Sequence, residues 1–105
     1  MTLDEVRARR TDLYEIAARH GVDRLSVVVA GPDVWLPYEA DVYIEVRFTP
    51  EAKRQPGGLW YFGALDRLRE EMSALLACNV GIGDMEGESD PPEFGRRRQA
   101  LAVEL

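Results

Sequence analysis

Apolar and polar residues alternate most regularly over residues 39–48, and this period of two predicts a half-buried strand. One face of that strand carries apolar side chains and the other mainly polar ones: Val42, Ile44, Val46 and Phe48 against Tyr43, Glu45 and Arg47. Two further runs predict strands. Residues 25–30 are mostly apolar and rich in β-branched side chains, and residues 79–83 form a short third run.

Apolar residues at three- and four-residue spacing predict a helix over residues 2–20 and a longer, principal helix over residues 59–77. The apolar stripe of the principal helix is predicted to face the core, and it consists of Leu59, Phe62, Leu65, Leu68, Met72, Leu75 and Leu76. Thr2 and Glu5 have the spacing of a capping box at the start of the first helix, and Gly21 is a usual stop after it. His20, beside that stop, is predicted to be a surface residue. Residues 49–58 are predicted as a polar loop, and residues 94–101 as a last short helix.

This order of elements predicts one α/β (α+β) domain over residues 1–105. A long helix separates the second and third strands, so those two strands do not form a simple hairpin. We therefore expect a small mixed sheet of about three to four strands with helices packed on it.

Composition narrows the possible partners of this domain. The chain has 105 residues, of which 46% are hydrophobic and 30% charged, as in an ordinary folded domain. Its net charge of −6 disfavours binding to nucleic acid, whose phosphates it would repel. The single cysteine, Cys78, excludes an internal disulfide. No apolar run reaches the roughly 20 residues that span a bilayer and no signal peptide is evident, so we expect no membrane association and a cytoplasmic location.

Glu39 and Asp41 are the first candidates for chemistry. Residues two apart in a strand point the same way, so both carboxylates would project together from the start of the second strand. Such a pair could hold a divalent cation such as Mg²⁺. On this pattern alone, however, the simpler interpretation is that they form the solvated side of a strand.

The order and spacing of five segments resemble a minimal nucleotidyltransferase domain of the polymerase-β-like superfamily. These segments are residues 14–22, 39–46, 65–76, 79–82 and 96–101. Domains of this kind are encoded beside HEPN-domain proteins in prokaryotic toxin–antitoxin modules. The resemblance implies a nucleotidyltransferase-type fold with a phosphate cradle after the first strand, an Asp-x-Asp metal motif and a third carboxylate on a later strand.

The chain departs from the family at each of these three motifs. At the phosphate cradle it has Ala30-Gly31 followed by proline, with no Gly-Ser. The Asp-x-Asp motif becomes Glu39-Ala40-Asp41, and Gly81 stands where the third carboxylate is expected, with Asp84 three residues further on. Two-metal nucleotidyl transfer depends on these groups, so the resemblance implies a degraded active site.

The first hypothesis is therefore a catalytically degenerate nucleotidyltransferase-fold protein that acts by protein binding and needs no cofactor. Its implied role is that of an antitoxin-like partner of a HEPN-type or other toxin, or a member of a homo-oligomer. Aromatic residues dominate interface energetics, which makes four of them candidate contacts: Trp35, Tyr38, Trp60 and Tyr61. Trp60 and Tyr61 are equally compatible with a place in the core.

The alternative is an active Mg²⁺-dependent nucleotidyltransferase that moves AMP from ATP to a hydroxyl of a protein or small molecule. Mg²⁺ would then lie on Glu39 and Asp41, with Asp84 or Glu86 as a displaced third acid. Ala30 and Gly31 would lie against the nucleotide. We prefer the first hypothesis, because both the phosphate cradle and the third carboxylate are missing from their expected places.

Overall fold

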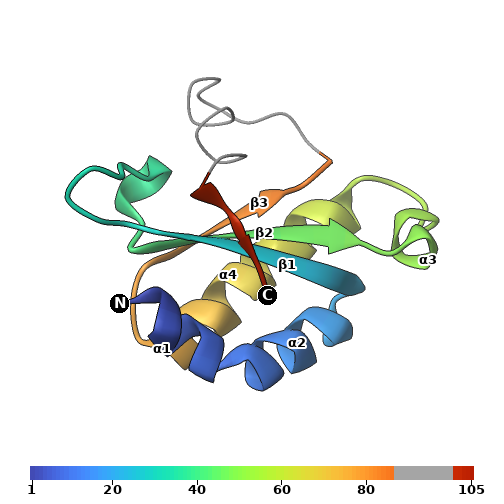
Figure 1. Cartoon of the computed structure of the whole chain (residues 1–105). Helices are drawn as coiled ribbons and strands as arrows, with labels where there is room; N and C mark the ends of the chain where they lie inside the picture. Colours follow the sequence, from blue (N-terminus) through green and yellow to red (C-terminus); the bar gives the residue numbers. More distant parts are fainter. Residues whose placement is uncertain (87–100) are drawn as a thin grey trace.

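A four-stranded mixed sheet with helices packed against one face forms the body of the molecule (Figure 1). The structure is a computed structural model, and it describes residues 1–86 and 101–105. The strands are β1 (Val22–Val29), β2 (Val42–Phe48), β3 (Val80–Asp84) and β4 (Val103–Glu104), in the order β3-β2-β1-β4. β1 is antiparallel to both β2 and β4, whereas β2 and β3 are parallel. The predicted α/β (α+β) fold with a small mixed sheet is confirmed.

The helices are α1 (Leu3–Ala8), α2 (Arg10–Arg19), α3 (Pro50–Lys53) and α4 (Leu59–Leu76), with a 3₁₀ turn, η1 (Pro37–Glu39). Thr2 caps α1 in the predicted box with Glu5. The prediction of one helix over residues 2–20 is wrong in one respect, because the chain breaks at Arg9 into α1 and α2. None of the helices in the described ranges is both long and apolar enough to cross a membrane.

The main core lies between the helices and the sheet. The inner faces of β1 and β2 meet the apolar sides of α1, α2 and α4, and the largest fully buried side chains there include Leu13, Leu25, Ile44, Phe48, Leu68 and Met72. The other face of the sheet carries a smaller cluster of Val28, Leu36, Ala40 and Tyr43. β2 is therefore buried on both faces and not half-buried as predicted, with Glu45 only 5% exposed.

Two predicted boundaries change for local reasons. Residues 49–58 are not all loop, because Thr49 accepts a hydrogen bond from the Ala52 N–H and Pro50 starts the short helix α3. The first strand begins at Val22, not at residue 25. The predicted helix over residues 94–101 lies outside the described residues, apart from Leu101.

Candidate functional site

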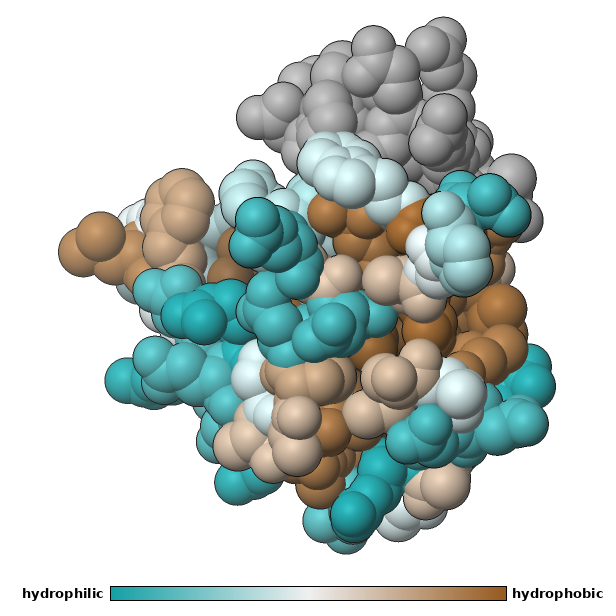
Figure 2. Space-filling model, turned by 90° about the vertical axis from the view of Figure 1, so that its left-hand side faces the viewer, coloured by the Kyte–Doolittle hydropathy of each residue, from teal (hydrophilic) through white to brown (hydrophobic). Residues whose placement is uncertain are grey.

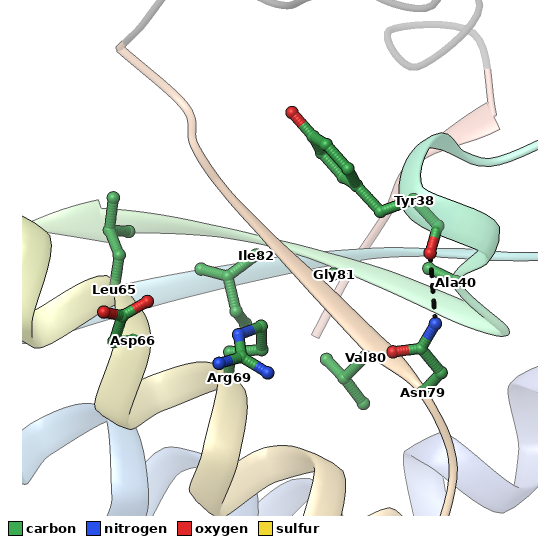
Figure 3. A pocket seen from close by; sticks show the side chains of 9 residues that line it. All are labelled: Tyr38, Ala40, Leu65, Asp66, Arg69, Asn79, Val80, Gly81 and Ile82. Atoms are coloured by element: carbon green, nitrogen blue, oxygen red, sulfur yellow. Dashed lines mark hydrogen bonds between the residues drawn. The ribbon is translucent and has the colours of Figure 1, made fainter.

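A groove of about 390 Å³ runs beside β3, the edge strand that continues from the C-terminal end of α4. Three segments line it, as Figure 3 shows: Tyr38 and Ala40 from the β1–β2 connection, Leu65, Asp66 and Arg69 from α4, and residues 79–82 of β3 and its start. The sheet order places β3 at one edge of the sheet, so the groove brings together a strand edge and side chains from both neighbouring elements.

The backbone of β3 points alternately toward β2 and away from it. The Asn79 carbonyl accepts a hydrogen bond from the Asp41 N–H at 2.8 Å, and the Met85 N–H donates to the Val46 carbonyl at 2.9 Å. Because the direction alternates along a strand, Gly81 also faces β2, whereas the peptide groups of Ile82 face outward. Among the described residues no strand pairs with this outer edge.

Asp84 shares the outward direction of Ile82, since it lies two residues further along the strand. Val80 does so as well, but its N–H is already taken by Ser73 Oγ of α4 at 3.2 Å. The outer edge of β3 thus presents the carbonyl of Val80 and both backbone groups of Ile82 and Asp84.

Tyr43 fills the space over the two glycines of β3. A Cβ atom on Gly81 would lie 2.9 Å from Tyr43 Cδ2, and one on Gly83 would overlap the Tyr43 hydroxyl. Side chains at these positions would displace the ring. Gly81 holds the position where the resemblance calls for a third carboxylate, and an acid there would not fit unless Tyr43 moved.

A strained turn places Tyr38 at the mouth of the groove. Tyr38 and Glu39 both have positive φ, at 60° and 55°, which is costly for residues with a Cβ. The Asn79 side-chain amide donates to the carbonyls of both residues, at 3.2 and 3.0 Å, and so offsets part of that cost. Tyr38 is left 76% exposed beside the edge of β3.

The same turn takes Glu39 out of the strand on which the two carboxylates were predicted to lie together. Glu39 belongs to η1, and the strand begins only at Val42, so Glu39 and Asp41 do not project from one strand as expected. Asp41 Oδ2 instead accepts a hydrogen bond from the Asn79 N–H at 3.0 Å, tying the start of β2 to the start of β3.

Asp84, the third predicted metal ligand, lies at the far end of the same pair of strands. The register pairs Val42 with Val80 and Val46 with Asp84, so five residues of strand separate Asp41 from the level of Asp84, on the order of 15 Å. One ion cannot bridge that distance. Consistent with this, residues 1–86 and 101–105 contain no group of three or more His, Cys, Asp or Glu side chains that could hold a metal ion.

Asp84 and Glu86 have other partners. Tyr61 Oη–H donates to Asp84 Oδ2 at 2.9 Å, and the Glu86 N–H donates to Asp84 Oδ1 at 2.9 Å. Glu86 forms an ion pair with Lys53 of α3. These contacts fasten the end of β3 to the start of α4 and to α3, which is a structural role.

At the predicted phosphate cradle, the backbone donors are already used. The Ala30 N–H donates to the Asp41 carbonyl at 3.0 Å, which extends the β1–β2 ladder. Gly31 and Val34 exchange two backbone hydrogen bonds, at 3.3 and 3.1 Å, and close a tight turn. A phosphate at this place would have to displace them.

The four candidate aromatic residues divide into two pairs. Trp35 and Tyr38 are exposed in the β1–β2 connection, whereas Trp60 and Tyr61 are partly buried against Phe48, with ring centroids 5.4 and 5.6 Å from it. The first pair is therefore available to a partner in this structure, and the second pair packs on the core.

Leu59 and Phe62 belong to the apolar stripe predicted to face the core, and this part of the prediction is wrong because both side chains are exposed. α4 makes its buried contacts through Leu68, Met72 and Leu76, further along the helix. A sequence signal for this existed, because apolar and aromatic residues occupy every position from 59 to 62 and cannot all face one side.

Two other groups complete the surroundings. His20 is not a plain surface residue as predicted, since its Nε2 lies 2.5 Å from Glu71 Oε2 and its side chain is only 14% exposed. Partial burial, and secondarily the Asp41 carboxylate, raise the pKa of the Cys78 thiol. A thiol with a raised pKa is a poor nucleophile, in line with a packing role.

Comparisons with protein-family models, curated proteins and solved structures found no match to this chain. The nucleotidyltransferase resemblance therefore rests on the sequence pattern alone.

Proposed function

We propose that this chain is a protein-binding module that takes an extended segment of a partner protein onto the outer edge of β3. The observation that carries this proposal is the outer edge of β3, which no strand of residues 1–86 and 101–105 covers and where the peptide groups of Ile82 face a groove. A strand added to a sheet edge gains main-chain hydrogen bonds from such groups, and neighbouring pockets select its side chains.

The composition of β3 supports this use of the edge. Exposed edges are commonly protected by proline, lysine or a bulge, and Val80–Asp84 contains none of these. Tyr38 on one side and Arg69 on the other give the groove an aromatic and a cationic contact, which fits a segment of mixed character.

The partner we propose is a HEPN-type toxin encoded beside this chain, as the sequence resemblance implies. The net charge of −6 complements the basic surface with which an RNase holds RNA, and such complementarity speeds and directs association. In this role the protein keeps the toxin from its substrate and performs no nucleotidyl transfer. The separation of Asp41 from Asp84 supports the non-catalytic role.

Co-expression with the neighbouring HEPN-type protein tests the proposal. Proline at an outward-facing edge position removes one donor and leaves the pairing to the inner strand in place. We expect the wild type and Ile82→Val to co-purify with the toxin in a fixed ratio, and Ile82→Pro to lose the complex while its circular dichroism stays unchanged. A folded Ile82→Pro variant that binds like the wild type, or a wild type that forms no complex, would reject it.

Titration with ATP and Mg²⁺ by calorimetry tests the enzyme alternative directly. Asp41→Asn is the suitable variant, because its amide oxygen still accepts from the Asn79 N–H while the charge is removed. We expect no saturable, metal-dependent binding by the wild type. Binding that Asp41→Asn abolishes would favour nucleotidyl transfer over the protein-binding role.

A further inference from the structure

A second hollow, of about 470 Å³, lies away from β3, between the C-terminal end of α2 and the first half of α4. Its charged lining side chains are Arg19 and Arg67, and no carboxylate lines it. The chain as a whole is acidic, with 19 acidic and 13 basic residues. The charged side chains that line this hollow are basic, so its local charge is opposite in sign to that of the chain.

The donors of both arginines are available. Glu71 is the nearest acidic group, but its Oε2 is engaged by His20 Nε2 at 2.5 Å. Arg19 Nη1 lies 3.8 Å from the other oxygen of Glu71, which is too long for a hydrogen bond. Arg67 makes no ion pair or hydrogen bond with any described residue. Two guanidinium groups therefore border the hollow with unused N–H donors.

Gly63, in the second turn of α4, lines the hollow without a side chain. Glycine inside a helix is destabilising relative to alanine, so a glycine at this position needs a structural or functional explanation. A Cβ atom at Gly63 would meet no atom within 4 Å, so the glycine is not required by packing within the described chain. The missing side chain instead keeps space free in the wall of the hollow.

Trp60 supplies an apolar wall whose position is fixed. Its ring stands edge-on against Phe48 at a centroid distance of 5.4 Å and an interplanar angle of 88°. The start of α4 adds the partial positive charge of a helix N-terminus, which favours an anion. No side chain offsets this charge, because Gly58 gives no side-chain cap and the first turn of this 18-residue helix has no acidic residue. This partial charge adds to the attraction of the two arginines for an anion, but it would not form a binding site without them.

We propose that this hollow binds a small organic phosphate. Guanidinium groups match the oxygens of a phosphate monoester in geometry and charge, which assigns the phosphate to Arg19 and Arg67. The volume lies within the roughly 300–1,000 Å³ of small-molecule sites and exceeds what phosphate alone would fill. The apolar body of the ligand lies against Trp60, over Gly63. This site is independent of the β3 edge and of the partner proposed for it.

Phenyl phosphate is a suitable probe, with Trp60 emission as the readout in a Trp35→Phe background that leaves one tryptophan. We expect a saturable change with phenyl phosphate, and weaker saturation with inorganic phosphate. Arg19→Gln and Arg67→Gln should each weaken binding roughly tenfold or more, since each removes a charge-assisted hydrogen bond. Arg69→Gln, two residues along α4 and facing the β3 groove, is the matched control and should bind like the wild type.

Gly63→Leu fills the hollow from within the helix. It should abolish binding without lowering the midpoint of thermal unfolding, because the added side chain enters open space and replaces a helix-weakening glycine. Four results would each overturn the proposal: no saturable change up to about 10 mM phenyl phosphate, equal losses in Arg67→Gln and Arg69→Gln, full binding by Gly63→Leu, or equal affinity for inorganic phosphate.

Discussion

Tyr61 joins the first turn of α4 to the last residue of β3. Its hydroxyl donates to Asp84 Oδ2 at 2.9 Å. Partial burial, together with the hydrogen bond to Asp84 and its charge, raises the pKa of Tyr61 to about 12. The neutral phenol is thus the form that the folded state favours.

This contact predicts that the free energy of unfolding falls as the pH rises above about 10. The unfolded-state pKa of tyrosine is about 10, below the folded-state value, so the contribution of Tyr61 is fully present below about pH 10 and is lost as pH rises toward 12. Tyr61→Phe should lower the free energy of unfolding by about 1 kcal/mol at neutral pH. Urea unfolding at pH 8, 10 and 11 measures both effects, and an equally steep fall in the wild type and Tyr61→Phe would contradict the assignment.

Gly21 and Gly57 form a matched pair with positive φ, at 74° and 79°, but with different surroundings. A Cβ atom on Gly21 would lie 2.7 Å from the Ala52 Cβ, whereas one on Gly57 would meet nothing within 4 Å. Gly57→Ala should therefore cost only the backbone term, about 1 kcal/mol. Gly21→Ala should cost about 2–4 kcal/mol, because overpacking adds to it. If chemical denaturation gave the same loss of free energy of unfolding for both variants, the close contact with Ala52 would be relieved by a small shift that costs little.

At the scale of elements, the periodic segments were predictable and the turns were not. The alternation over residues 42–48 predicted β2, and the spacing of Leu68, Met72 and Leu76 predicted the core side of α4. The break at Arg9 carries no glycine or proline that would announce it. The late start of β2 depends on a left-handed turn at Tyr38, which is held by Asn79 about 40 residues further along the chain. No local pattern contains that contact.

The candidate site was predictable only in its parts. Tyr38 was a candidate contact from its residue type, and it does line the groove. The groove itself depends on the parallel register of β2 and β3, which sets Val80 beside Val42 and carries Asp84 to the other end. Register between strands separated by a helix is a tertiary property, so the distance between Asp41 and Asp84 could not be read from sequence spacing.

β3 depends on its glycines because the Tyr43 ring lies against them. Gly83→Ala would bring a Cβ atom to 2.8 Å from Tyr43 Cζ and into its hydroxyl, so the ring or the strand must shift. We expect a loss of about 2 kcal/mol in the free energy of unfolding. Gly31→Ala, where a Cβ meets no atom within 4 Å, is the control and should change stability little. Unchanged stability in Gly83→Ala would show that Tyr43 moves aside without cost.

For the molecule as a whole, the sheet order predicts which strands resist local unfolding and which unfold first. β2 is the strand buried along nearly its whole length, between β1 and β3. β4 is short and is tied to β1 largely at its surface, through the ion pair of Arg24 with Glu104. Figure 2 shows apolar surface in several places among hydrophilic side chains on the face it presents, so polar groups do not cover that side completely. Local unfolding should therefore begin at the edge strands of the sheet and reach β2 last.

Hydrogen exchange measured by NMR tests this order and, with it, the free edge of β3. The Ile44 amide of the buried strand should exchange far more slowly than that of Leu105, which donates to the Leu25 carbonyl beside β4. Along β3 the rates should alternate, because Gly81 and Met85 donate toward β2 whereas Ile82 faces outward. A partner bound at the edge should then protect Ile82 selectively and leave Gly81 unchanged. Equal protection of Ile82 and Gly81 in the free protein would mean that the edge is already covered, and a partner would have to bind elsewhere.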